Sequence, residues 1–113
     1  MKLPNNAFAY IPPGKLTAYL LSETHSVGKS KAKLFRSVGY NELTVNLVKE
    51  GLLSIAHTED IVETQSSEHG VKYVIEGMLQ TPAGGTLKIR TIWIIDRGQD
   101  RPRFVTAYPV QMK

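Results

Sequence analysis

The sequence contains no cysteine, and this absence excludes several kinds of chemistry. Without a thiol the chain can form no disulfide, no thiolate metal cluster and no cysteine nucleophile. A reducing compartment suits such a chain, so we expect a cytoplasmic location. The three histidines, His25, His57 and His69, lie far apart and form no metal-ligand pattern with carboxylates close in sequence. We therefore expect neither a bound metal nor another cofactor.

Long apolar runs are also missing from the chain. The longest, such as residues 92–95, are far shorter than the roughly 20 residues of a membrane-spanning helix. Near the N-terminus, Pro12 and Pro13 interrupt a short apolar stretch before a signal-peptide core is complete. We expect no membrane span and no signal peptide.

The length and composition are those of a small globular domain. At 113 residues the chain is close to the commonest domain size, and we assign residues 1–113 to a single domain. Hydrophobic residues make up 42% of the chain and charged residues 21%, which argues against disorder. The formal charge of +4 favours anionic partners such as nucleic acid or anionic lipid.

The first half of the chain, residues 13–58, has the spacing of helices. Apolar residues three and four apart predict one helix over about residues 13–22. A second follows the turn at residues 25–28 and ends before Gly39, a typical C-terminal glycine. Asn41 is the expected N-cap of a third helix that ends near residue 57 or 58. The apolar stripe of this third helix is Leu43, Leu47, Val48, Leu52 and Ile55.

Alternation of apolar and polar residues replaces helical spacing from residue 60 onward. The predicted strands are residues 60–64, 71–79, 86–96 and 103–109. Turn-forming residues separate them at 66–70, 82–85 and 97–102. The expected fold is α+β, with two or three N-terminal helices packed on one face of a four-stranded antiparallel meander. The helical half is residues 13–58 and the sheet half residues 60–109.

Alternation also assigns the two faces of the central strands. The more apolar face, which we expect to contact the helices, is Val71, Tyr73, Ile75, Leu79, Leu87, Ile89 and Trp93. The opposite face carries Glu76, Lys88 and Arg90, and a simple hairpin register brings Glu76 and Arg90 together. That second face is the candidate binding surface.

A histidine beside several lysines suits phosphate chemistry near the N-terminus. His25 precedes the second predicted helix, whose positive N-terminal end lowers the pKa of an imidazole and suits a base at neutral pH. Lys29 and Lys31 would neutralise a phosphate held by the backbone N–H groups of that helix. The alternative is a surface histidine beside a solvated cationic helix face.

A second polar group lies on the predicted strands. Arg90, Arg103, Thr106 and Tyr108 occupy neighbouring strands, and an arginine fork with hydroxyl donors suits a pentavalent phosphorane. Thr106 and Tyr108 alternate in step with Phe104, a residue typical of a core. Which face of the sheet they occupy therefore remains open.

A set of motifs over nearly the whole chain carries a family resemblance. The motifs are Leu3-Pro4-Asn5, Lys15-Leu16, Tyr19-Leu20-Leu21, His25 with Gly28, Lys31-Ala32, Phe35, Val74-Ile75-Glu76-Gly77, Arg90-Thr91-Ile92-Trp93 and Thr106-Ala107-Tyr108-Pro109. They resemble a family of small uncharacterised bacterial and cyanobacterial proteins. Similar modules also occur as C-terminal domains of large secreted polymorphic toxins, and stand-alone versions are often encoded beside a small antitoxin candidate.

The resemblance implies a function and a site. In its helix-then-sheet order the family is similar to the superfamily of barnase, EndoU, the tRNA-cleaving colicins and RelE, which are metal-independent ribonucleases. By that resemblance the catalytic residues are His25, Lys31, Arg90 and Thr106. The candidate binding residues are Lys29, Glu76, Arg103 and Tyr108. Of these, the resemblance itself implies Tyr108, as a secondary residue of the site.

The favoured hypothesis is a small endoribonuclease toxin of a toxin–antitoxin system. Its implied partners are an RNA substrate and a small antitoxin protein. The alternative is a binding module without catalysis, in which the same basic face holds a partner protein or a nucleic acid. The sequence does not decide between them, and it does not indicate an oligomeric state.

Overall fold

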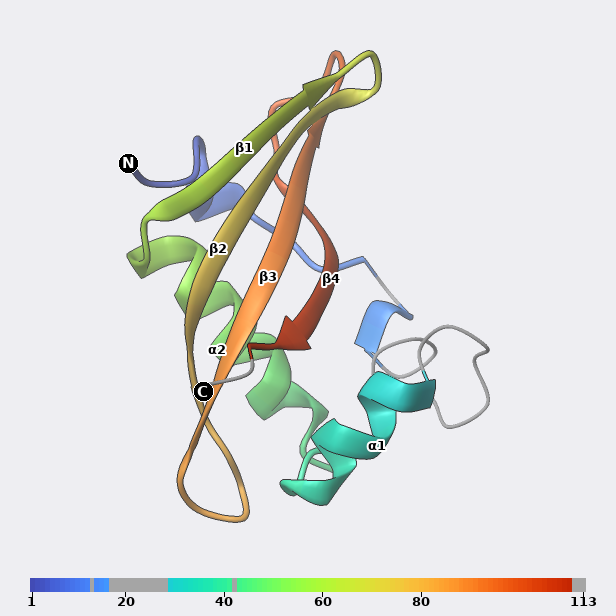
Figure 1. The fold of residues 1–113 in the computed structure, drawn as a ribbon. Helices are drawn as coiled ribbons and strands as arrows, with labels where there is room; N and C mark the ends of the chain where they lie inside the picture. Colours follow the sequence, from blue (N-terminus) through green and yellow to red (C-terminus); the bar gives the residue numbers. More distant parts are fainter. Residues whose placement is uncertain (13, 17–28, 42, 111–113) are drawn as a thin grey trace.

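The computed structural model describes residues 1–12, 14–16, 29–41 and 43–110, and for residues 29–32 it describes the backbone alone. The elements, in chain order, are η1 (Asn6–Phe8), α1 (Lys29–Ser37), α2 (Val45–Thr58), β1 (Ile61–Ser67), β2 (Gly70–Gln80), β3 (Thr86–Asp96) and β4 (Arg103–Pro109). The four strands form one antiparallel sheet in the order β1-β2-β3-β4 (Figure 1). The predicted α+β class and antiparallel meander are confirmed. Of the two or three predicted helices, two are described, and the one expected over residues 13–22 lies mostly outside the described residues.

The strand bounds follow the alternation closely, and the largest difference is at β1. β3 and β4 begin and end where predicted, and β2 is one residue longer at each end. β1 was expected over residues 60–64 but continues to Ser67, because its second half still pairs with β2 as far as Gly70. The turn predicted over residues 66–70 is therefore reduced to Glu68 and His69.

The end of α1 is set by Gly39, as its position predicted. Gly39 has a φ of 104°, a conformation that strains any residue with a side chain. Its N–H donates to the carbonyl of Arg36 at 3.1 Å, and the Tyr40 N–H donates to the carbonyl of Phe35 at 3.0 Å. These two bonds satisfy carbonyls that the last turn of the helix leaves without an intrahelical partner.

The start of α2 corrects the sequence prediction. The helix begins at Val45, so Asn41 is not its N-cap. Asn41 instead accepts the Leu43 N–H with its side-chain oxygen at 2.8 Å, while its own N–H donates to Thr44 Oγ1 at 2.9 Å. Asparagine commonly forms such local turns, and here the turn delays the helix. Leu43 is consequently 95% exposed and Leu47 51% exposed, so the prediction that they belong to the buried stripe of the helix is wrong.

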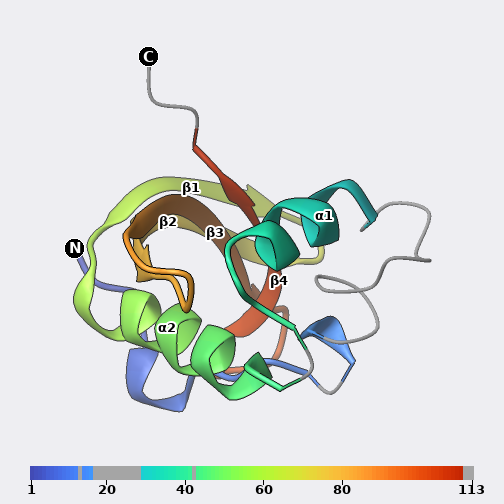
Figure 2. The ribbon, with the colours of Figure 1, turned by 90° about the horizontal axis from the view of Figure 1, so that it is seen from below.

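The rest of the α2 stripe packs on the sheet as expected. Figure 2 shows the sheet curving, with α2 along its inner side. Val48, Leu52 and Ile55 of α2 are buried. A Cβ built on Gly77 of β2 would lie 2.7 Å from Cγ1 of Ile55, so only glycine allows the helix to approach the strand this closely. The buried residues of the core are Leu3, Leu16, Phe35, Tyr40, Val48, Leu52, Ile55, Ala56, Ile75, Leu79, Ile89, Trp93, Phe104 and Ala107.

One polar side chain lies at the centre of this core. Thr91 is fully buried on the inner face of β3. Its hydroxyl donates to the carbonyl of Ile75 at 2.7 Å and accepts the indole N–H of Trp93 at 2.9 Å. Trp93, itself fully buried, meets Phe104 edge-on with ring centroids 5.3 Å apart. The threonine therefore satisfies the one polar atom of the tryptophan and ties it to the neighbouring strand.

The first ten residues connect the two edge strands of the sheet. The carbonyl of Met1 accepts the N–H of Ile61 at 2.7 Å, at the start of β1. The carbonyl of Tyr10 accepts the N–H of Phe104 at 2.9 Å, at the start of β4. Between them Leu3 is buried in the core. This segment thus links β1 to β4, a role that the sequence analysis did not anticipate.

The described helices are also short relative to a lipid bilayer. None of them combines the length and the hydropathy that crossing a membrane would require.

We expect Thr91→Val to destabilise the protein by about 1–3 kcal/mol, because the shape is kept while the Trp93 indole N–H loses its acceptor inside the core. The free energy of unfolding in urea measures this effect. Thr86→Val, at an exposed position of the same strand, is the control and should change it by less than about 0.5 kcal/mol. Equal effects of the two substitutions would show that the buried hydrogen bond contributes nothing specific.

Candidate functional site

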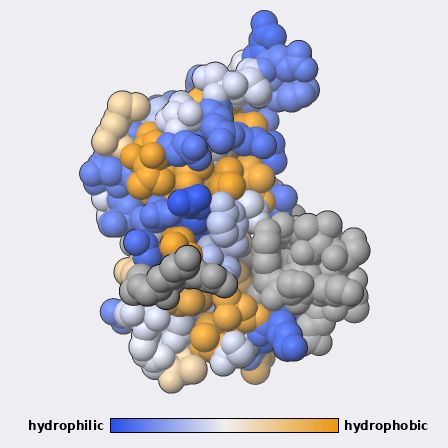
Figure 3. All heavy atoms as spheres, in the orientation of Figure 1, coloured by the Kyte–Doolittle hydropathy of each residue, from blue (hydrophilic) through white to orange (hydrophobic). Residues whose placement is uncertain are grey.

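The face of the sheet that turns away from α2, here called the outer face, carries most of the predicted site. Figure 3 shows this side, with hydrophobic residues gathered on it between hydrophilic ones. Alternation places Glu76 of β2 and both Lys88 and Arg90 of β3 on the outer face, as the sequence predicted. Thr106 and Tyr108 of β4 join them there.

An irregularity in β4 decides the face of Thr106 and Tyr108. Thr106 lies opposite Ile92 of β3, but Phe104 lies opposite Trp93, so Val105 is an extra residue with no partner in the register. Such a bulge shifts the alternation by one position. Phe104 therefore points into the core, whereas Thr106 and Tyr108 lie on the outer face beside Arg90. Simple alternation from Phe104 would have placed them in the core.

Glu76 and Arg90 form the ion pair that the hairpin register predicted. They lie directly opposite each other, with Arg90 Nη2 2.7 Å and Nε 2.8 Å from Glu76 Oε2. Tyr108 is the partner of Arg90 on the other neighbouring strand. The pKa of Arg90 is raised, first by its bond to the Glu76 carboxylate and second by its hydrogen bond with Tyr108. The Arg90 side chain nevertheless remains 39% exposed, so it is a charged, oriented group that a ligand can reach.

Arg103 also lies on the outer face, but away from Arg90. It is opposite Ile94, four positions along β3 from Arg90, which corresponds to about 13 Å. Its guanidinium forms a two-point ion pair with Asp96, Nε to Oδ2 and Nη2 to Oδ1, both 3.0 Å. Arg103 lowers the pKa of the Asp96 carboxyl by this hydrogen bonding. The two predicted arginines therefore do not converge on one phosphate.

The apolar middle of the outer face and Asp96 were both missed by the sequence analysis. Val74 and Ile94 are each only 5% exposed, although they do not belong to the core beneath α2. With Ile92 they separate the Glu76–Arg90 pair from the Asp96–Arg103 pair. The signal was present in the sequence, because Asp96 and Ile94 alternate in step with Arg90 on β3.

The lysine and histidine part of the predicted site is not placed. His25 lies outside the described residues. Lys29 is the first residue of α1 and Lys31 follows two residues later in the same helix, as expected, but their side chains are not described. Their roles stay predictions. Among the residues that are described, no three histidine, aspartate or glutamate side chains come together as metal ligands.

A family model for a domain of unknown function, DUF6883, matches residues 2–111. The chain belongs to the DUF6883 family. This confirms the expected membership of an uncharacterised family, whereas the ribonuclease superfamily stays a prediction. Among curated proteins, none matches the sequence of this DUF6883 domain at a significant level.

The fold of the DUF6883 domain is shared with a protein of known structure. A contact-dependent growth inhibition toxin–immunity protein complex from Klebsiella pneumoniae 342 contains a chain that matches it with a TM-score of 0.72. The match covers 95% of this chain and 97% of that chain, at 14% sequence identity. A likeness at this identity shows a common fold.

The Asp96–Arg103 pair makes the stability of the domain depend on pH. Because the pKa of Asp96 is lowered in the folded state, the pair stabilises the protein fully above the pKa of the unfolded carboxyl, near 4. That stabilisation is lost as the pH falls through the lower pKa of the folded state. Asp96→Asn should cost roughly 0.5 kcal/mol at pH 7, since solvent screens a pair that is about one third exposed.

Urea unfolding at pH 7 and again below pH 3 checks this expectation. The difference between Asp96→Asn and the wild type should disappear at the lower pH, while Asp100→Asn, in the following loop, should change little at either pH. A difference that persists below pH 3 would mean that the ion pair is not its source.

Proposed function

We propose that this DUF6883 domain is the toxin of a bacterial toxin system and acts as a metal-independent endoribonuclease. The observation that carries the proposal is the Arg90 guanidinium. It is held in one orientation by Glu76 and Tyr108, keeps its positive charge, and lies partly exposed on a face that no described helix covers. Two of its nitrogens bond to Glu76, which leaves other N–H groups of the fork for a phosphate.

The proposed reaction is attack of a ribose 2′-hydroxyl on the adjacent phosphorus. His25 takes the 2′ proton, the 2′ oxygen bonds to phosphorus, and the bond from phosphorus to the 5′ oxygen breaks, the 5′ oxygen receiving a proton from water. The products carry a 2′,3′-cyclic phosphate and a 5′-hydroxyl. Arg90 and Lys31 stabilise the extra negative charge of the phosphorane, and Thr106, beside Ile92 on the outer face, positions it.

The binding residues divide into two groups in this proposal. Lys29 and Tyr108 contribute to holding the reacting phosphate. Glu76 acts by orienting Arg90. Arg103, about 13 Å farther along the sheet, would contact a neighbouring phosphate of the same RNA strand.

Two further findings support the proposal, one for an RNA substrate and one for a toxin. The net charge of +4 favours a polyanionic substrate. The shared fold links the domain to a contact-dependent growth inhibition toxin–immunity protein complex, and a protein partner of inhibitory type would suit a toxin of this family.

A second candidate function is a protein-binding module without catalysis. The observation that favours it is the Glu76–Arg90 ion pair. Because the Glu76 carboxylate already neutralises Arg90, the pair can serve a structural role on the sheet and bind no phosphate. The apolar side chains of Val74, Ile92 and Ile94 beside it would then form the centre of a protein interface.

The two candidates separate in a cleavage assay with total RNA and purified tRNA in EDTA, followed by analysis of the 3′ ends. The wild type should cleave and leave cyclic phosphate, and His25→Ala should be inactive. Arg90→Ala should slow cleavage by about 100-fold or more, since it removes a charged group that stabilises the transition state.

Arg97→Ala, at an exposed position just after β3, is the control and should cleave like the wild type. The cleavage rate of a variant is compared with that of the wild type only if the variant unfolds in urea like the wild type. Cleavage at the wild-type rate by His25→Ala would reject the base, and the absence of cleavage by the wild type would favour the binding module.

A further inference from the structure

The two halves of β2 differ in how their outer edge is covered. β1 pairs with β2 only from Gly70 to Ile75, so the last five residues of β2, Glu76 to Gln80, extend past the start of β1. Figure 1 shows this part of β2 forming the edge of the sheet below β1. We call the segment from Glu76 to Gln80 the open edge. A strand edge of this kind is a template for pairing with another chain.

The backbone groups of Met78 point toward the open edge. In an antiparallel pair, two opposite residues either exchange both backbone hydrogen bonds or neither. The carbonyl of Lys88, which lies opposite Met78, accepts the Val110 N–H on the β4 side. The backbone groups of Lys88 therefore point away from β2, and Met78 and Lys88 exchange no backbone hydrogen bond. The carbonyl of Gln80, two residues farther along β2, likewise points away from β3 and accepts the Tyr40 hydroxyl at 2.9 Å.

Met78 is left with an available donor and acceptor. Among the described residues, no group forms a hydrogen bond with its N–H or its carbonyl on the open side. Its side chain is 50% exposed. A strand laid along the open edge would bond to these groups with no change in the β2–β3 ladder.

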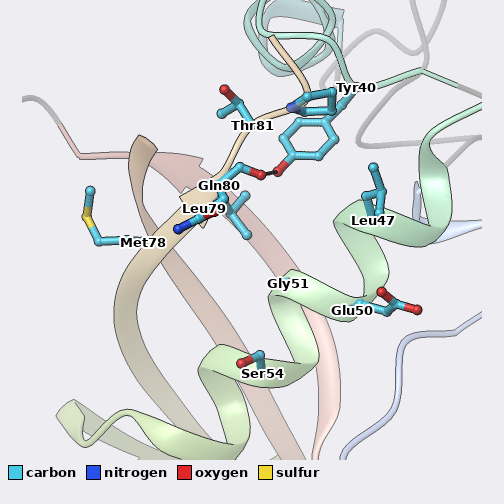
Figure 4. Close-up of a pocket in the computed structure, with 10 residues that line it drawn as sticks. Tyr40, Leu47, Glu50, Gly51, Ser54, Met78, Leu79, Gln80 and Thr81 are labelled. Carbon is cyan, nitrogen blue, oxygen red and sulfur yellow. Dashed lines mark hydrogen bonds between the residues drawn. The ribbon is translucent and has the colours of Figure 1, made fainter. Parts of the chain in front are cut away.

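Two hollows flank the open edge, one on each face. On the α2 side a groove of about 410 Å³ is lined by Leu47, Glu50 and Leu79 among others. On the outer side a hollow of about 540 Å³ is lined by Glu59, Asp60 and Glu76, with Lys88. Figure 4 shows Leu47 and Glu50 on the α2 side of β2 and the side chain of Met78 pointing to the opposite side.

Alternate side chains of a strand point to opposite faces, so an added strand would place successive residues in these two hollows. The α2-side groove offers apolar surface from Leu47. Three carboxylates, Glu59, Asp60 and Glu76, line the outer hollow with one ammonium, Lys88, and Glu76 is already paired with Arg90. Asp60 is paired with the terminal amine and Lys2, but Glu59 forms no ion pair with any described residue.

We propose that the open edge of β2 is the docking site for an extended segment of a partner protein in which apolar and basic residues alternate. The segment adds a strand beside Met78, its apolar residues enter the α2-side groove, and its basic residues enter the outer hollow. Charge argues for such a partner and against a second copy of this chain, because the chain's own open edge, Glu76 to Gln80, has no basic residue to pair with Glu59. The proposal goes beyond the proposed ribonuclease and does not require it.

The probe for a first test is a seven-residue peptide of alternating valine and lysine with blocked ends. Its matched control has glutamate in place of each lysine. Titration into the isotope-labelled protein, without RNA, should shift the amide resonances of Met78 and Gln80 and slow hydrogen exchange at Met78. The glutamate peptide should bind at least tenfold more weakly.

A backbone test uses Met78→Pro against Met78→Ala. Proline removes only the N–H that points to the open edge, and an edge position whose N–H faces solvent is one of the strand positions that tolerate proline. Both variants should unfold in urea near the wild type, and Met78→Pro should bind the peptide at least tenfold more weakly than Met78→Ala. Should the proline variant not fold, a lysine peptide N-methylated at alternate amides tests the same bonds and should bind at least tenfold more weakly than its parent.

Three results would overturn the proposal. They are resonance shifts confined to the exposed edge of β1 or no shifts at all, equal binding of the lysine and glutamate peptides, and a dimer of the protein alone that occupies Met78 in sedimentation and exchange experiments. None of these outcomes concerns RNA cleavage, so they are distinct from a failure of the proposed function.

Discussion

The pairing of β2 with β3 is the constraint on which the other features depend. Eleven consecutive residue pairs, from Gly70 with Asp96 to Gln80 with Thr86, run without an irregularity. This register sets Thr91 beside Ile75 inside the sheet and Arg90 opposite Glu76 outside it. A shift by one residue would exchange the two faces and leave charged groups in the core. The buried bond from Trp93 to Thr91 makes that shift costly, because it holds the largest core side chain in one place.

The strands β2, β3 and β4 show how far local sequence determines this structure. The alternation in β2, β3 and β4 is strong, and it predicted the sheet, the inner face and the Glu76–Arg90 pair. It left the face of Thr106 and Tyr108 on β4 open, because the Val105 bulge has no local signature and exists because both Phe104 and Ala107 are buried against the core. The face of Thr106 and Tyr108 therefore follows from tertiary packing.

The helical half was less predictable, for a similar reason. Asn41 can cap a helix or form a local turn, and the turn is favoured here because Thr44 bonds to both Asn41 and the Gly39 carbonyl. The links from the N-terminal segment to β1 and β4, and the ion pair of Asp96 with Arg103, depend on which strands become neighbours at the sheet ends. No spacing within one segment could reveal them. The open edge of β2 likewise exists only because β1 is the shorter strand.

The outer face and the open edge give this DUF6883 domain two surfaces of opposite character. The outer face presents Arg90, oriented by Glu76 and Tyr108, on a chain with an excess of positive charge, which suits a phosphodiester. The open edge adjoins Glu59, a carboxylate with no ion pair to any described residue, which suits a basic strand. Glu76 belongs to both surfaces, since it pairs with Arg90 and lines the outer hollow. In the proposed function, a domain that acts on RNA and is held by a protein partner would use both surfaces.

The role of Arg90 in holding a phosphate is tested most directly by its side-chain Nε–H resonance during titration with an RNA whose 2′-hydroxyls are methylated, so that the RNA binds without being cleaved. We predict a saturable shift of the Arg90 resonance, and no shift of the Arg97 resonance, at concentrations where fluorescence anisotropy shows the RNA to be bound. RNA binding that leaves the Arg90 resonance unchanged would contradict the claim that this guanidinium holds the phosphate.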